Sequence, residues 1–125
     1  MPTEQALLQR FQRGDIDAAT FGHRDHVRTA WAMLGPQNMT FHQAYAAYRS
    51  GLVRLTRAAG VPEKFSETQT LGWLALVHEA VARTGEASDF VAFEAAAGLH
   101  RHSLADRYPA ARLNGAAART GLILP

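Results

Sequence analysis

The apolar positions along the chain recur every three or four residues and fall into five segments separated by glycine, proline and polar loops. This spacing places the apolar side chains of each segment on one face of a helix. The segments cover about residues 4–13, 23–34, 41–59, 67–84 and 89–97. Abundant alanine and few β-branched residues also favour helices. The pattern therefore predicts an all-α protein.

Polar residues precede several of these segments at positions suited to capping. Thr3, Thr40, Ser66 and Ser88 can each accept a hydrogen bond from a first-turn amide, and Ser66 with Gln69 has the capping-box spacing. The loops are short, so successive helices are expected to run antiparallel. The helices at 23–34 and 67–84 should then point the same way and begin at the same end of the bundle.

The last part of the chain, residues 100–125, has weaker periodicity and is expected to form short helical turns. A length of 125 residues suits one hydrophobic core. We therefore expect residues 1–125 to form a single helical domain. Its predicted architecture is a bundle of about five helices with an irregular C-terminal segment packed over it.

Composition excludes several classes of protein. Hydrophobic residues make up 47% of the chain and charged residues 19%, which is typical of a globular protein. The absence of cysteine excludes disulfides and thiolate metal sites. The net charge is only +2 and the basic residues, all arginines except Lys64, are scattered, so nucleic acid is not an expected partner. No signal peptide or apolar span of roughly 18 residues is seen, so no membrane is expected and the location is predicted to be cytoplasmic.

The strongest candidate for chemistry is the stretch FGHRDHVRTAW, residues 21–31. Its apolar stripe begins with His23 and His26, about 60° apart around the helix axis and roughly one turn apart along it. Two imidazoles at this spacing can share one metal ion. The helix N-terminus disfavours imidazolium, which keeps both rings able to bind an ion or accept a proton.

A third group for this site is Glu67, in the first turn of the helix that should begin at the same bundle end. His23, His26 and Glu67 with open coordination positions would be a catalytic site for a divalent ion such as Zn, Fe or Mn. The flanking Thr68 and Thr70 would orient Glu67 and contact substrate, while Lys64 would neutralise an anionic group. The leading hypothesis is a small metal-dependent enzyme acting on a small molecule.

Other interpretations of these residues stay open. Without an ion, His26 and Glu67 could form an acid/base pair. The same side chains also fit a hydrogen-bonded rim on a non-catalytic module that binds a ligand or another protein, including a homodimer. Whether the chain is an enzyme is therefore undecided at this point. His42, His78 and the pair at positions 100 and 102 have weaker claims to function, and the tryptophans fit core stripes.

Three segments of the chain together resemble a family of small bacterial helical proteins of uncharacterised activity. Its motifs are F-x-H-x-x-H-x-x-x-A-W, K-[YF]-H-E-T-x-T and Y-S-x-x-R-L-x-S-x-x-A-R. The matching positions here are Phe21, His23, His26, Ala30, Trp31, Lys64, Phe65, Glu67, Thr68, Thr70, Tyr108, Arg112, Leu113, Ala118 and Arg119. The resemblance implies that His23, His26, Glu67 and Thr68 belong to one site.

The sequence departs from this family pattern at three positions. Ser66 replaces a histidine, which removes a third imidazole and weakens the case for tight metal binding. Pro109 and Gly115 replace serines. Two residues of the last motif, Tyr108 and Arg112, would either contact substrate or fix the C-terminal segment to the bundle, and the guanidinium could clamp a carboxylate.

Overall fold

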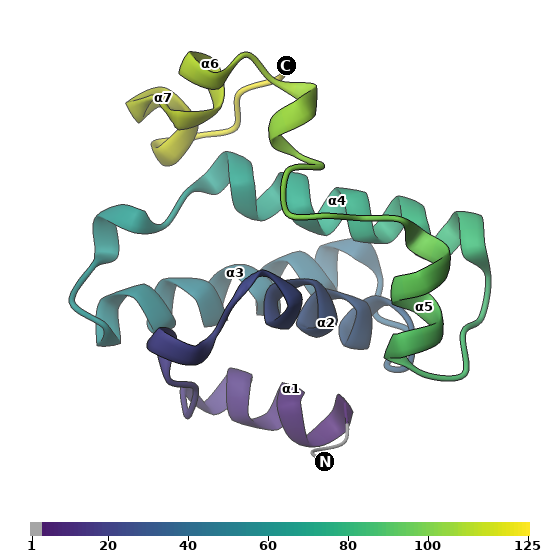
Figure 1. Cartoon of the computed structure of the whole chain (residues 1–125). Helices are drawn as coiled ribbons and strands as arrows, with labels where there is room; N and C mark the ends of the chain where they lie inside the picture. The colour runs from purple at the N-terminus through teal and green to yellow at the C-terminus, as the bar shows by residue number, and fades with distance from the viewer. Residues whose placement is uncertain (1–3) are drawn as a thin grey trace.

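The computed structural model describes residues 4–125, which form helices joined by turns and loops and contain no strand (Figure 1). The all-α prediction is therefore confirmed. The elements are α1 (Glu4–Arg13), η1 (Ala18–Thr20), α2 (His23–Leu34), α3 (Phe41–Ala58), η2 (Pro62–Lys64), α4 (Glu67–Thr84), α5 (Phe90–Ala97), η3 (Ala105–Arg107), α6 (Ala110–Asn114) and α7 (Ala116–Thr120). The elements η1–η3 are single turns of 3-10 helix.

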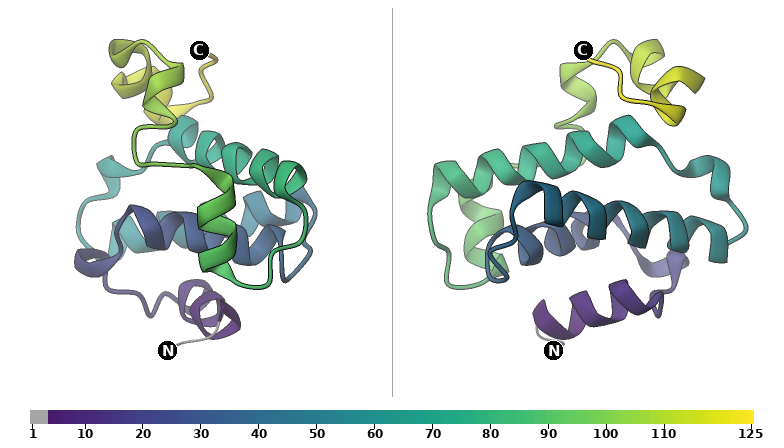
Figure 2. Two further views of the ribbon diagram at one scale, coloured as in Figure 1. Left: turned by 45° about the vertical axis from the view of Figure 1, so that its right-hand side comes forward. Right: turned by 180° about the vertical axis from the view of Figure 1, so that it is seen from behind.

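The elements stack in successive layers (Figures 1 and 2). Helix α1 lies on one side of the α2–α3 pair, α4 lies on the other side, and α5 closes one end. The short C-terminal helices α6 and α7 lie beyond α4, on its far side from the core. This matches the expected C-terminal segment packed over a bundle. No helix within residues 4–125 has the length and apolar character needed to cross a bilayer.

Local hydrogen bonds explain where α3 and α4 begin. The hydroxyl of Thr40 accepts from the Gln43 amide, and the Gln43 side chain accepts from the Thr40 amide, which completes a capping box. The hydroxyl of Ser66 accepts from the Gln69 amide in the same way at the start of α4. Both caps were predicted from the sequence, and both are confirmed.

The predicted cap of α5 was wrong by one residue. The carboxylate of Asp89, not the hydroxyl of Ser88, accepts from the amide of Ala92. Both side chains suit a cap, but α5 begins at Phe90, so Asp89 directly precedes the helix and has the extended backbone that a cap requires. The other predicted cap, Thr3, lies outside the described residues.

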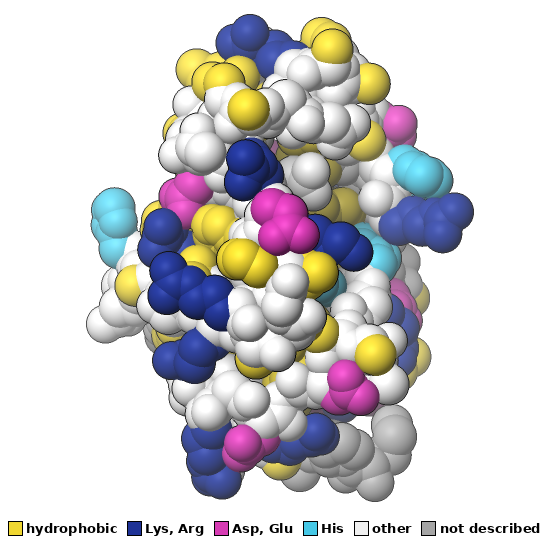
Figure 3. All heavy atoms as spheres, turned by 90° about the vertical axis from the view of Figure 1, so that its left-hand side faces the viewer, with side chains coloured by type: hydrophobic (Ala, Val, Ile, Leu, Met, Phe, Trp, Pro, Cys, Tyr) yellow, Lys and Arg dark blue, Asp and Glu magenta, His cyan; other side chains and the backbone are white. Residues whose placement is uncertain are grey.

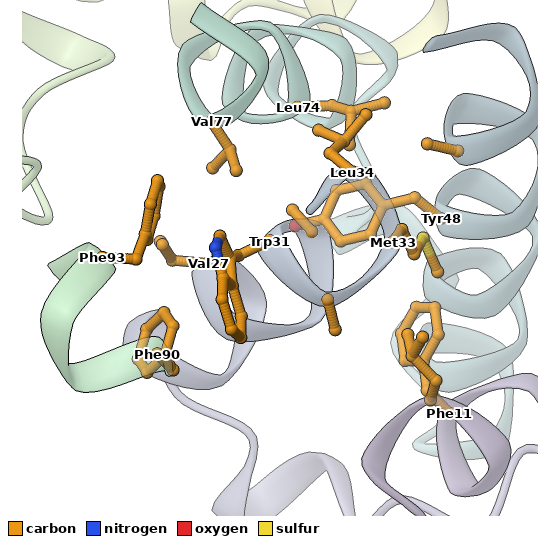
Figure 4. Close-up of a cluster of buried hydrophobic side chains, with 14 of the residues drawn as sticks. Phe11, Val27, Trp31, Met33, Leu34, Tyr48, Leu74, Val77, Phe90 and Phe93 are labelled. Atoms are coloured by element: carbon orange, nitrogen blue, oxygen red, sulfur yellow. The ribbon is translucent and has the colours of Figure 1, made fainter. Parts of the chain in front are cut away.

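The core is formed by side chains that converge from α1 to α5 (Figure 4). Trp31 on α2 lies against Phe90 and Phe93 of α5, with ring centroids 5.7 and 5.9 Å apart. Where α1 meets α3, the missing side chain of Gly51 makes room for Phe11. A Cβ atom at that glycine would lie 2.1 Å from the Phe11 ring.

The C-terminal segment is held to α4 by Thr68. Its buried hydroxyl donates to the Gly121 carbonyl at 2.7 Å and accepts from the Ile123 amide at 3.0 Å. On the other side of the segment, Tyr108 donates to the Ile123 carbonyl and Arg112 to the Leu124 carbonyl. One threonine on α4 therefore serves both as donor and as acceptor for the end of the chain.

Replacing Thr68 by valine should loosen this end of the chain. The change keeps the side-chain volume but leaves the Gly121 carbonyl and the Ile123 amide without their partner, at a cost on the order of 1 kcal/mol. Hydrogen exchange should speed up for amides in the last five residues and much less in α2 and α3. Thr84→Val is the matched control, since the Thr84 hydroxyl bonds only to Ala80 within its own helix. Equal protection of the C-terminal amides in both variants would refute this role for Thr68.

Candidate functional site

A pocket of about 300 Å³ lies where α2 and α4 begin, bordered also by α3 and η2. We call it the histidine pocket. It is lined by Phe21, Gly22, His23, His26, Tyr48, Leu52, Thr56, Lys64, Phe65, Ser66, Gln69, Thr70 and Trp73. Figure 3 views the side of the molecule that is on the left in Figure 1, and shows histidine side chains among apolar, basic and acidic ones there. The prediction that α2 and α4 begin at the same end is therefore confirmed.

His26 forms part of the inner wall of this pocket. Its ring packs against Phe21, with centroids 4.5 Å apart. Burial, with a smaller contribution from neighbouring His23, lowers the pKa of His26 to about 4, although Asp25 acts in the opposite direction. At neutral pH the imidazole is therefore uncharged, with one nitrogen able to accept a hydrogen bond.

His23 lies one turn closer to the start of α2 and is more exposed. Its ring meets Trp73 of α4 edge to face, with centroids 4.8 Å apart. Burial lowers the pKa of His23, and electrostatic interactions with His100 and Arg101 lower it further, although Glu94 acts in the opposite direction. Each imidazole is therefore positioned by an aromatic neighbour, and both favour the neutral form.

The ring nitrogens of both histidines are available to a ligand. Among residues 4–125, neither ring makes a hydrogen bond, whereas every fully buried side-chain nitrogen or oxygen in that range has a partner. The ring nitrogens of His23 and His26 are therefore not fully buried. They keep access to the pocket that both rings line.

Glu67, the predicted third ligand, points away from the histidine pocket. Its carboxylate accepts from Arg49 Nε at 2.7 Å and from the Tyr45 hydroxyl at 3.4 Å, both on α3. The residues of α4 that line the pocket lie roughly 100° around the helix from Glu67. The structure therefore does not bring Glu67 to the two imidazoles, either as a metal ligand or as the partner of His26 in an acid/base pair.

The donor set for a metal ion is thus incomplete. In the part of the chain that the structure describes, no three His, Asp or Glu side chains are grouped so that they could hold one ion. The histidine pocket offers two imidazoles and the hydroxyls of Ser66 and Thr70. A Zn, Fe or Mn site of the predicted three-residue kind does not fit this arrangement.

Removal of divalent ions should therefore leave the protein unchanged. We expect EDTA to leave the melting temperature where it was, because an ion that binds the folded state tightly would have stabilised it. Thermal unfolding followed by circular dichroism, with and without the chelator, measures this melting temperature. A lower melting temperature after EDTA, restored by Zn²⁺ in the native protein but not in His26→Gln, would reinstate the metal site.

The remaining predicted residues divide into two groups. Lys64 and Thr70 line the histidine pocket, as expected of substrate-binding residues. Thr68, Tyr108 and Arg112 do not line it, and their polar atoms hold the C-terminal segment instead. The open alternative for Tyr108 and Arg112 is thus decided by geometry in favour of fixing the tail.

Four aromatic residues of the pocket wall were not predicted as part of the site, among them Tyr48, which is buried on α3. Phe21 and Phe65 come from loops, and Trp73 had been assigned to a core stripe. A signal was present in α4, where positions 66, 69, 70 and 73 share one face with the spacing i, i+3, i+4, i+7. That face mixes polar and aromatic residues, which is more typical of a binding surface than of a core.

The other histidines lie outside the pocket wall. His78 is exposed on α4 and packs edge to face on Phe41, and His42 is exposed on α3. The pair at positions 100 and 102 lies on the surface, where His100 is 3.8 Å from the Asp106 carboxylate. The structure gives these four no shared site with His26.

Comparison with known proteins finds no match, whether to a family model, a curated protein or a solved structure. The family resemblance drawn from the three motifs thus stays a prediction.

Proposed function

We propose that this protein binds a small molecule in the histidine pocket, with His26 as a hydrogen-bond acceptor for it. One observation carries the proposal: a largely buried, neutral imidazole with no hydrogen bond within residues 4–125 lies on the wall of a 300 Å³ pocket. Polar groups in apolar surroundings are costly unless paired, so such a ring is suited to a ligand that supplies the missing hydrogen bond.

The low pKa of His26 favours binding over catalysis in the free protein. A general base works best when its pKa is close to the working pH. With a pKa of about 4, the imidazole is neutral at pH 7 but only weakly basic. This favours binding over proton abstraction, and proton transfer would require a bound ligand that raises this pKa.

The proposal can be tested with small fragments and NMR. A set of small carboxylates, amides and alcohols would be added to protein with labelled histidine and tryptophan side chains. Binders are expected to shift the ring signals of His23, His26 and Trp73, and to lose affinity in His26→Gln. His42→Gln, which changes an exposed histidine on α3, is the matched control. The proposal fails if no fragment shifts these rings, or if both variants bind equally well.

A further inference from the structure

The wall of the histidine pocket carries one formal charge, and it is positive. Lys64 is the charged residue among those that line it, and no carboxylate does so. Three acidic residues adjoin wall residues in the sequence: Glu63 is exposed on η2 next to Lys64 and does not line the pocket, and the other two are already engaged. Asp25 accepts from the Gly22 amide at 2.9 Å, and Glu67 is paired with Arg49. Nothing on the wall would therefore repel an anion.

Two helices also begin at this pocket. Helix α2 starts at His23 after the cap residue Gly22, and the longer α4 starts after the cap residue Ser66. The first amides of a helix lack partners within it and carry the positive end of the helix dipole. Two such ends at one pocket add to the charge of Lys64 and favour a negative ligand group.

An unpaired hydroxyl marks where that group would bind. Thr70 is only 5% exposed, lines the pocket and has no side-chain hydrogen bond within residues 4–125. Because no fully buried side-chain oxygen in that range lacks a partner, this hydroxyl is not fully buried, and the pocket that Thr70 lines gives a ligand access to it. It can donate to a ligand oxygen one turn from the start of α4.

The remaining wall of the pocket suits a flat apolar group. The rings of Phe21, Phe65 and Trp73 surround a space at the small end of the range for ligand pockets, about 300–1,000 Å³. Aromatic rings stack favourably with a planar ligand. The wall is thus apolar on one part and electropositive on another.

We propose that the ligand of the histidine pocket is a small organic anion, a carboxylate carried on an aromatic or other apolar group. Its carboxylate interacts with Lys64, Thr70 and the N-termini of α2 and α4, and its ring contacts Phe21 and Trp73. This inference rests on the proposed function and adds the chemical class of the ligand. Because the attraction is electrostatic, the affinity for the anion should fall as salt is added.

Benzoate and benzamide test the charge directly, because they have nearly the same shape and differ in charge. Benzoate should bind about tenfold more tightly than benzamide, as charged hydrogen bonds are stronger than neutral ones. Lys64→Met should lower benzoate affinity severalfold and leave benzamide affinity unchanged. Arg57→Met, which removes a charge outside the pocket wall, should alter neither. Thr70→Val should lower the affinity for benzoate. Thr70→Ser, which keeps a hydroxyl at this position, should retain it.

The outcomes separate this inference from the proposed function. If benzamide binds as tightly as benzoate, or if Lys64→Met and Arg57→Met behave alike, the anion assignment is overturned while the pocket remains a binding site. If neither probe shifts the ring signals of His26 and Trp73, the anion assignment is also overturned. If no other fragment shifts these ring signals either, the proposed function is overturned as well.

Discussion

Replacing Gly51 by alanine is expected to lower the free energy of unfolding by about 3 kcal/mol, at the upper end of typical costs for overpacking a core. The added Cβ would lie 2.1 to 2.8 Å from three carbons of the Phe11 ring. That ring is 1% exposed and cannot move aside, because it stacks between Phe21 and Tyr48 at centroid distances of 5.9 and 6.1 Å. Helix α1 would have to shift from α3.

Urea unfolding measures this loss, with Ser50→Ala as the control. Ser50 is the exposed neighbour of Gly51 on the same helix, so its change should have little effect. Adding Phe11→Leu to Gly51→Ala should recover part of the stability, since the smaller side chain makes room for the methyl group. If Gly51→Ala lowers the free energy of unfolding no more than Ser50→Ala does, α1 and α3 are not in close contact at this position.

Lowering the pH from 7 to 4 is expected to cost about 3 kcal/mol of stability through His26 alone. Its pKa is lowered from the ordinary 6.5 to about 4 in the folded protein. Between these values the unfolded chain binds a proton at this residue and the folded chain does not, so acid favours unfolding. The contribution is fully present above pH 6.5 and is lost as the pH falls towards 4.

The contribution of His26 is isolated by comparison with His26→Gln. Urea unfolding of both proteins would be followed at several pH values between 4 and 7, because other titrating groups act on both and cancel in the difference. The native protein should lose more stability than the variant across this range. Parallel curves for the two proteins would mean that His26 is not buried in neutral form, and would remove the main support for the proposed function.

The elements that the sequence predicted well are those governed by local chemistry. The bounds of α2 follow from its apolar stripe and from the Gly35–Pro36 stop, and the caps Thr40 and Ser66 follow from one hydrogen bond each. The common end of α2 and α4 follows from short loops. This was enough to place His23 and His26 at a shared site with Lys64 and Thr70.

The failures concern tertiary contacts that no local pattern encodes. Glu67 lies at the predicted end of α4, but an arginine on α3 engages its carboxylate. Thr68 resembled a residue that orients Glu67, yet the chain returns from more than fifty positions away to bond its hydroxyl. In both cases the partner lies far away in sequence, so the spacing of residues could not reveal it.

Intermolecular nuclear Overhauser effects can locate benzoate on the protein, and so test directly whether the histidine pocket is where it binds. We expect contacts from the benzoate ring protons to the side chains of Phe21, His26 and Trp73, and their loss when Thr70→Trp fills the pocket. Contacts confined to other surfaces, or contacts that persist unchanged in the filled variant, would contradict the claim that the histidine pocket is the binding site.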